Sequence, residues 1–507
     1  MSFNQKRYSM SASRKNYDWI IAGGTVVDGS GQPGYVADVG VVGEHIVDIG
    51  DLSGEQAARR IDATGLVVAP GFIDVHTHDD ASLIIRPEMR AKLSQGVTMV
   101  ICGNCGISGA PYSYVGDPPG LLRLVFKSDK FIASSLQQYM EKVSAAEPAI
   151  NAAFLTGHAT LRMNVMGQGE QLERAATDSE IGQMRAQLIE CLEQGSLGLS
   201  TGLFYQPARA APTQEIIEIA APLKDFNGVY TTHMRDEADQ VVESLNEAFE
   251  IGRAIDAPVI VSHHKCQGPQ NFGRSVETLA MFEEARKQQQ VSLDVYPYTA
   301  SSTVLNEAMV HNSISTLITW CEPHPEYCAR ELTEIGREMG CSLTEAIERL
   351  QPAGAVYFSM DEDDVRRIMC APGCMIGSDG LPEDEHPHPR LWGTFPRVLG
   401  KYVRELKIMS LEEGVHRMTG LSARQFGIKN RGLIEAGKFA DLTIFDPRTI
   451  VDSATFEQPT TPATGIAYVI VNGKMAWENG ANTNNRAGKV LRRQDLNNDL
   501  NNQSFAE

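Results

Sequence analysis

The segment APGFIDVHTHDD ends an apolar run with two histidines, His76 and His78. Residues two apart on a β-strand point to the same face, so both imidazoles can reach one metal ion. A His-x-His pair by itself is often surface decoration. Its position directly after a strand-like run of apolar residues favours the metal-binding interpretation.

Further side chains of metal-ligand type follow other strand-like runs: Cys105 in VICGNCGIS, His233 in YTTHMRDE, His263 in VIVSHHK and Asp379 in MIGSDGLP. A thiolate with imidazoles suits zinc, and a carboxylate can complete the set. Six such residues at successive strand ends are difficult to explain as core packing. His264 falls on the opposite strand face and is interpreted as a core histidine.

A metal ion with an open coordination position lowers the pKa of a bound water towards about 7 and polarises a carbonyl, which is the chemistry of a hydrolase. Asp379 is then expected to take the proton of the water and pass it to the departing nitrogen, as general base and general acid. A purely ligating role is the alternative for Asp379, and the two roles are compatible.

Cys102 and Cys105 form a C-x-x-C pair, which can indicate a redox pair or half of a structural zinc site. The sequence contains no second C-x-x-C to complete a four-thiolate site. We therefore interpret Cys105 as the ligand and Cys102 as a packed thiol. Cys370 and Cys374 are interpreted as buried.

These residues need a scaffold that brings strand ends together. Strand-like and helical runs alternate over roughly 350 residues, which predicts a parallel TIM-type (β/α)8 barrel over residues 69–425, of the α/β class. A helix-rich stretch at about 299–360 breaks the alternation and predicts an insertion that acts as a lid. Short strands at 17–68 and 426–482 predict one small β-sandwich, with tails at 1–16 and 483–507.

Composition narrows the function classes. The chain has 507 residues, 42% of them hydrophobic, so it can bury a large core. Its net charge of -19 argues against a nucleic-acid partner, because phosphates would be repelled. No apolar run approaches the about 20 residues that span a bilayer. Nine cysteines without a disulfide pattern, and no secretory signal, favour a cytoplasmic protein.

With these motifs, the chain resembles the amidohydrolase superfamily and, within it, the N-acyl-D-amino-acid deacylases, or D-aminoacylases. The resemblance runs from about Asp18 to Gly480 and includes GFIDVHTH, GNCGIS, THMRDE, SHHK, GSDG and KFADLTIFDP. It implies one tightly held zinc ion on Cys105, His233 and His263. It also implies a second, weaker or empty metal position on His76, His78 and Asp379.

The same resemblance implies zinc-dependent hydrolysis of the amide bond of a small-molecule N-acyl-D-amino acid. The residues it assigns to the free carboxylate of the substrate are Lys265, Tyr296, Ser302 and Arg390. A guanidinium fork grips a carboxylate bidentately, and lysine and tyrosine add donors, so the assignment is chemically consistent. D-selectivity rests on the resemblance alone, and the preferred side chain, the acyl group and the oligomeric state stay open.

Two other functions compete. A cyclic amidase of the dihydropyrimidinase or hydantoinase type is expected to use a metal-bridging lysine, whereas the segment AAFLTGHATLRM offers His158 and no lysine. A non-catalytic scaffold on the same fold is expected to lack metal ligands, and here every ligand position is filled.

Overall fold

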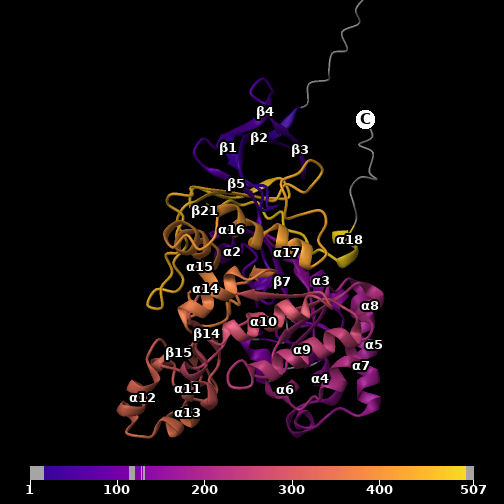
Figure 1. Cartoon of the computed structure of the whole chain (residues 1–507), viewed down its shortest axis with the longest axis vertical. Coiled ribbons are helices and arrows are strands. Elements are labelled where there is room, and N and C mark those ends of the chain that lie inside the picture. Colours follow the sequence, from indigo (N-terminus) through magenta and orange to yellow (C-terminus); the bar gives the residue numbers. More distant parts are fainter. Residues whose placement is uncertain (1–15, 114–119, 127, 129–131, 498–507) are drawn as a thin grey trace, which may run out of the picture.

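The structure, a computed structural model, describes the whole chain except residues 1–15, 114–119, 127, 129–131 and 498–507. Figure 1 shows a β-rich region built from both ends of the chain, a barrel with its helices next to it, and a smaller unit that projects from the far side of the barrel. The described part contains no helix that is both long enough and apolar enough to cross a membrane.

The centre of the molecule is a barrel of parallel strands that are buried along nearly their whole length. The strands run in chain order around the barrel, in two hydrogen-bonded groups, β6-β7-β8 and β9-β10-β11-β12-β13-β17, with β9 continuing β8. Their bounds are β6 (Phe72–Asp74), β7 (Val97–Cys102), β8 (Asn151–Phe154), β9 (Thr156–Gly157), β10 (Gly198–Gly202), β11 (Val229–His233), β12 (Val259–Val261), β13 (Val291–Val295) and β17 (Cys374–Ile376). The barrel expected from the alternating sequence pattern is confirmed.

The last and first barrel strands meet just beyond their carboxyl ends. Thr77 forms a parallel bridge with Gly380. The backbone N–H of Asp379 donates to the carbonyl of His76 at 2.7 Å, and that of His78 donates to the carbonyl of Gly380 at 3.2 Å. Closure of the barrel therefore places His76, His78 and Asp379 side by side.

Amphipathic helices cover the outside of the barrel. The helix expected after THMRDE is α9, in which Val241, Leu245, Phe249 and Gly252 are buried and Val242 is half-buried, so its apolar face packs on the strands. The helices of the barrel are α1 (Ser82–Ile85), α2 (Arg90–Leu93), α3 (Leu136–Ala145), α4 (His158–Met166), α5 (Asp178–Gln194), α6 (Gln206–Arg209), α7 (Thr213–Ala220), α8 (Leu223–Phe226), α9 (Val241–Ile255), α10 (Ser275–Ala285), α14 (Glu362–Cys370), α15 (Arg390–Arg397), α16 (Leu411–Met418) and α17 (Gly420–Gln425).

The two chain ends form one nine-stranded sheet around a shared apolar core that includes Ile21, Val39, Val68, Leu442 and Ile470. β5 joins the halves, because it pairs with β1 on one side and with β18 on the other. The strands are β1 (Tyr17–Val26), β2 (Tyr35–Val42), β3 (His45–Gly50), β4 (Ala57–Asp62), β5 (Val67–Pro70), β18 (Leu442–Phe445), β19 (Ile466–Val471), β20 (Lys474–Glu478) and β21 (Ala481–Asn482). The β-sandwich expected from both ends of the chain is confirmed.

The insertion differs from the helix-rich unit that the sequence suggested. It contains a three-stranded antiparallel sheet in the order β14-β16-β15 as well as helices, because the runs STLITWC and AGAVYF are short and rich in apolar and β-branched residues. Its elements are β14 (Ala300–Val304), α11 (Glu307–His311), β15 (Ser315–Cys321), α12 (Leu332–Met339), α13 (Leu343–Leu350) and β16 (Ala353–Phe358). In Figure 1 this unit stands apart from the chain ends.

Residues 483–497 were expected to belong to a tail, and here the structure differs. Val490 bridges Ala152 of β8, Leu491 and Leu496 are buried, and α18 (Arg493–Asn497) follows. Leu491 and Leu496 pack in one apolar cluster with Leu197 and Val229, at the amino ends of barrel strands. The sequence did not predict this packing because the segment is mostly polar. Residues 498–507 and 1–15 lie outside the described part of the chain.

Candidate metal centre

Each of the six candidate ligands lies at or just beyond the carboxyl end of a barrel strand. His76 and His78 follow β6, Cys105 follows β7, His233 ends β11, His263 follows β12 and Asp379 follows β17. All six side chains are buried or nearly so. Successive parallel strands point their carboxyl ends to one face of a barrel, and this face is where barrel enzymes carry their active sites.

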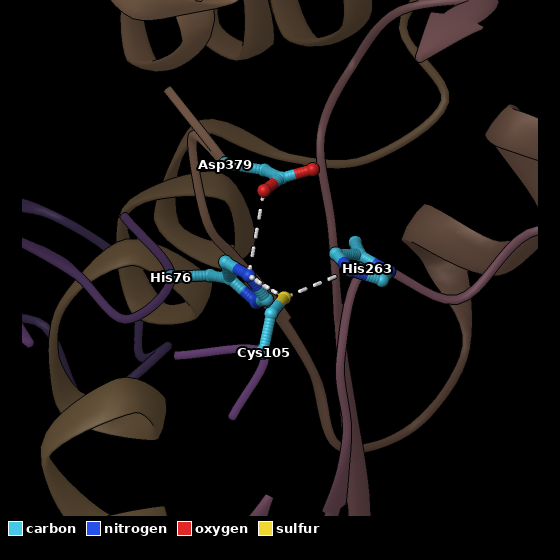
Figure 2. A group of neighbouring side chains, drawn as sticks. All are labelled: His76, Cys105, His263 and Asp379. Atoms are coloured by element: carbon cyan, nitrogen blue, oxygen red, sulfur yellow. Dashed lines mark hydrogen bonds and ion pairs between the residues drawn. The ribbon is translucent and has the colours of Figure 1, made fainter. Parts of the chain in front are cut away.

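The ligand atoms converge around the thiol of Cys105. Its Sγ lies 3.2 Å from Nε2 of His76 and 3.4 Å from Nε2 of His263, and Figure 2 shows both imidazoles turned towards the sulfur. Oδ1 of Asp379 lies 3.4 Å from the same nitrogen of His76 and 3.3 Å from Nε2 of His78. The ring of His233 packs edge-on against that of His263, with centroids 4.5 Å apart.

Three of these residues have a left-handed backbone, with φ of +53° at Cys105, +35° at His263 and +50° at Asp379. Residues other than glycine rarely adopt positive φ, and such strained positions cluster at functional sites. At these three positions just beyond the strand ends, the side chains converge with that of His76 on one group of ligand atoms.

The electrostatic environment favours a thiolate at Cys105. Burial opposes ionisation of the thiol, but the imidazoles of His76 and His263 outweigh this effect and hold its pKa well below the ordinary value. Cys102 is also fully buried, and burial together with nearby carboxylates raises its pKa well above the ordinary value. Cys102 is therefore a packed thiol, whereas Cys105 has the charge state that a metal ligand needs.

Two histidines of the group are held by acids. Burial disfavours the charged imidazole of His78, but hydrogen bonding to Asp379 raises its pKa to about 9. Nδ1 of His76 lies 3.3 Å from Oδ1 of Asp294, whose carboxylate also accepts the backbone N–H of His263 at 2.9 Å. Asp294 thus orients the ring of His76 so that Nε2 faces the thiol.

Asp379 carries a charge in this environment. Burial alone would raise the pKa of its carboxyl, but the guanidinium of Arg390 and the surrounding imidazoles lower it well below the ordinary value. Nη1 of Arg390 lies 2.9 Å from Oδ2 of Asp379. The acid therefore connects the histidines to the arginine.

The four residues assigned to the substrate carboxylate lie near one another around the ring of Tyr296. Lys265, Tyr296 and Ser302 line the same cavity of about 170 Å³ as Cys105 and Asp379. Arg390 is fully buried and lies behind Tyr296, with its guanidinium 4.5 Å from the ring centroid, and its Nη2 donates to the carbonyl of Ser302 at 3.2 Å. Arg390 is not among the cavity-lining residues, and in this structure its guanidinium forms an ion pair with Asp379.

Sequence reasoning overlooked three charged residues around the site. Glu237 and Asp294 contact the histidines directly, and both are buried. A carboxylate inside the apolar strand VSLDVYPY was a signal for Asp294, and the quoted motif THMRDE contains Glu237 without indicating its partner.

Lys92 is the third of these residues and has no exposed surface. Its Nζ lies 2.7 Å from Asp74, 2.9 Å from both Asp79 and Ser378, and 3.0 Å from Thr77. These partners lie on both sides of the junction between β6 and β17. The ammonium therefore fastens the junction that carries the first two histidines and Asp379.

The other candidates of the sequence lie outside the centre. Nε2 of His264 is 2.9 Å from the hydroxyl of Thr278 on α10, which is a core position. His158 faces Glu215 on α7 at 3.3 Å.

The donor set fits zinc. Ligand atoms of His76, Cys105, His263 and Asp379 lie within 4.8 Å of one another, and so do those of His233, Glu237 and His263. Within the described residues, Nδ1 of His233 and Nδ1 of His78 are buried without a hydrogen-bond partner. A low-pKa thiol among imidazoles and a carboxylate is the environment that zinc selects.

A model of the amidohydrolase family matches residues 59–296 and 318–476. The chain is 52% identical to a D-aminoacylase from Alcaligenes xylosoxydans xylosoxydans over 94% of this chain and 98% of that protein. It is 47% identical to an N-acyl-D-aspartate deacylase from the same organism, over 94% of this chain and 95% of that protein.

Solved structures agree with these matches. A D-aminoacylase with 52% identity superposes with a TM-score of 0.91, over 94% of this chain and 100% of the other, and its binuclear metal centre is described by one-metal activation and second-metal attenuation. An N-acyl-D-glutamate deacylase from Bordetella bronchiseptica, in complex with zinc and a phosphonate that mimics the tetrahedral intermediate, is 44% identical with a TM-score of 0.90, over 94% and 100% of the two chains.

Proposed function

We propose that this chain, which belongs to the amidohydrolase family and within it to the D-aminoacylases, hydrolyses the amide bond of N-acyl-D-amino acids to a carboxylate and a free D-amino acid. The observation that carries the proposal is the convergence of Cys105, His263, His76 and Asp379 at the carboxyl face of the barrel. The resemblance to the D-aminoacylases implies a cysteine among the zinc ligands, and the thiol of Cys105 lies in this group.

The cofactor is zinc. We propose that Cys105, His233 and His263 hold the tight zinc ion, and that His76, His78 and Asp379 form a second position with the thiolate of Cys105 close to both. When bound, zinc polarises the amide carbonyl and makes water a stronger nucleophile at neutral pH. The relatives with zinc or a binuclear centre support this assignment.

Asp379 moves the proton in the proposed reaction. Its carboxylate takes a proton from the attacking water and delivers it to the amide nitrogen, so that the C–N bond breaks and a neutral amine leaves. The acid lines the cavity and is ionised in its surroundings, so it can accept a proton at neutral pH.

We propose that Lys265, Tyr296, Ser302 and Arg390 bind the free carboxylate of the substrate. Lys265 and Tyr296 already line the cavity, and Nζ of Lys265 lies 5.7 Å from the ring centroid of Tyr296. A substrate carboxylate can compete with Asp379 for the guanidinium of Arg390, because the two anions present the same acceptor geometry. Fixing the carboxylate on one side of the amide gives the basis for selection between enantiomers.

We also propose a reducing, cytoplasmic setting, since the proposed zinc ligand must remain a free thiolate. All nine cysteines are free in the structure, and Cys105 is buried. No nucleic-acid partner is proposed for a chain with a net charge of -19.

The direct test compares linear with cyclic amides. Zinc-loaded protein is incubated with N-acetyl-D-leucine and N-acetyl-D-glutamate in one set, and with hydantoin and dihydrouracil in the other, and the products are quantified. Release of free D-amino acid without opening of the cyclic amides supports the proposal. Opening of the cyclic amides alone would support the hydantoinase alternative, and zinc binding without any turnover would support a non-catalytic scaffold.

A further inference from the structure

Glu237 lies beside the candidate zinc ligands His233 and His263, on the loop after β11, lines the same cavity and is 5% exposed. Its Oε1 lies 3.0 Å from Nδ1 of His263, and its Oε2 lies 3.7 Å from Nε2 of His233. The other ring nitrogen of His263, Nε2, lies 3.4 Å from the sulfur of Cys105. The imidazole of His263 therefore spans the distance from the Glu237 carboxylate to the thiol shown in Figure 2.

Lys265 occupies the same corner. Its Nζ lies 2.7 and 2.8 Å from the two carboxylate oxygens of Glu237 and 2.8 Å from Nδ1 of His263. An ammonium group has only donors, so this contact is a hydrogen bond only while Nδ1 of His263 is an acceptor. That arrangement places the ring hydrogen on Nε2, the nitrogen that faces Cys105.

If His263 held zinc through Nε2, this arrangement would reverse, because the ring hydrogen would then have to lie on Nδ1, which would become a donor. Two donors at 2.8 Å cannot bond to each other, so Lys265 loses His263 as a partner. Oε1 of Glu237, at 3.0 Å, is already in place to accept the new N–H.

We propose that Glu237 is a positioning residue that fixes His263 in its zinc-binding tautomer, anchors Lys265 through the two carboxylate contacts, and in the zinc-loaded protein leaves the third N–H of Lys265 available for the carboxylate of the substrate. In this proposal Glu237 acts through these two neighbours, whose side chains it contacts directly. The inference rests on the proposed function for the zinc ion and for the carboxylate-binding role of Lys265. It adds the residue that couples the two.

The first test is the zinc affinity of Glu237→Gln, measured by competition with a chromophoric chelator. Loss of such an outer partner is expected to weaken zinc binding by about 10–100-fold. Glu247→Gln is the matched control, because Glu247 is a half-buried carboxylate on α9 that pairs with Arg235 at 2.8 Å and is not among the residues that line the cavity. Its zinc affinity is expected to equal that of the wild type.

A second variant separates positioning from folding. Glu237→Gln alone leaves the ammonium of Lys265 buried and unpaired, which destabilises a protein, whereas Glu237→Gln with Lys265→Met removes both charges. We expect the double variant to recover the melting temperature while its zinc affinity stays low, and Lys265→Met alone to bind zinc as the wild type does. Wild-type zinc affinity in the double variant would overturn the proposal.

These measurements need no substrate, so the two proposals can fail separately. Weak zinc binding by both Glu237 variants, together with no cleavage of N-acyl-D-amino acids by the wild type, would support the role of Glu237 and refute the proposed reaction. Unchanged zinc binding by both Glu237 variants, together with cleavage of N-acyl-D-amino acids by the wild type, would refute the role of Glu237 and support the proposed reaction.

Discussion

Nη1 of Arg390 lies 2.9 Å from Oδ2 of Asp379, with both groups buried. The residue proposed to move the proton is thus ion-paired with a residue proposed to bind the substrate carboxylate. If a substrate binds at Arg390 as proposed, it would change the surroundings of Asp379. Under that proposal, the substrate carboxylate would take part in the reaction as well as in recognition.

Replacement of Arg390 tests this coupling. In Arg390→Met the pKa of Asp379 is expected to rise, because the guanidinium that lowers it is gone. Activity that needs ionised Asp379 is present above its pKa and lost as the pH falls through it. The acid limb of the kcat/KM profile is therefore expected to move to higher pH. An acid limb at the wild-type pH would show that Arg390 does not lower the pKa of the catalytic acid.

The same variant should also bind substrate less tightly. A hydrogen bond to a charged group contributes about 1.5–3 kcal/mol, so KM is expected to rise by about 10–100-fold. The control is Arg397→Met, since Arg397 lies about two turns further along, at the end of α15, and pairs with Asp452. Steady-state kinetics with N-acetyl-D-leucine give both values.

Removal of the thiol is expected to abolish tight zinc binding. Cys105→Ala deletes a proposed ligand. Loss of a residue that only hydrogen-bonds to a ligand weakens metal binding by about 10–100-fold, so the zinc affinity of Cys105→Ala should fall by more than this. Cys102→Ala removes a packed thiol of the same strand end and should retain the metal. Equilibrium dialysis followed by metal analysis measures both, and a fully loaded Cys105→Ala protein would refute the ligand assignment.

Asp379→Asn is expected to separate metal binding from turnover. The amide cannot take a proton from water, so kcat should fall by about 10²–10⁴-fold, the usual contribution of general acid–base catalysis. Tight zinc binding should persist, since Cys105, His233 and His263 remain. A variant that kept wild-type kcat would assign the proton transfer to another group.

The second metal position is expected to depend on pH. His78 has a pKa of about 9 in the metal-free protein, raised by its bond to Asp379 against the effect of burial. Its proton must leave before the nitrogen can bind a metal, so affinity at this position should rise by at least about tenfold per pH unit up to about pH 9. Titration calorimetry with protein that already holds one zinc measures the slope, and His78→Asn should flatten it.

The parts of the fold and of the candidate site that could be predicted from the sequence are those marked by a local sequence pattern. The ligands and the barrel could be predicted because His76, Cys105, His263 and Asp379 each follow a short apolar strand, and parallel strand ends meet at one face. The positive φ at three of these positions could not be read from residue type, because side chains other than glycine rarely adopt it.

The residues that hold the ligands in place were harder to predict. Lys92 lies in a short helix, and nothing in its local sequence marks it. Its partner Ser378 follows β17, 286 positions later in the sequence, and the two meet only because β17 lies beside β6 in the closed barrel. This contact makes Lys92 the centre of a buried network. Asp294 meets His76 across 218 positions. Such partnerships exist only in the closed barrel, so no local pattern marks them. The antiparallel sheet of the insertion was missed because its strands are short and separated by helices.

The most direct test of the account is the ratio of kcat/KM for N-acetyl-D-leucine to that for N-acetyl-L-leucine, measured by the free leucine released from zinc-loaded protein. We predict release from the D-enantiomer and none above the Cys105→Ala background from the L-enantiomer. Equal rates with both enantiomers, or release from the L-form alone, would contradict it.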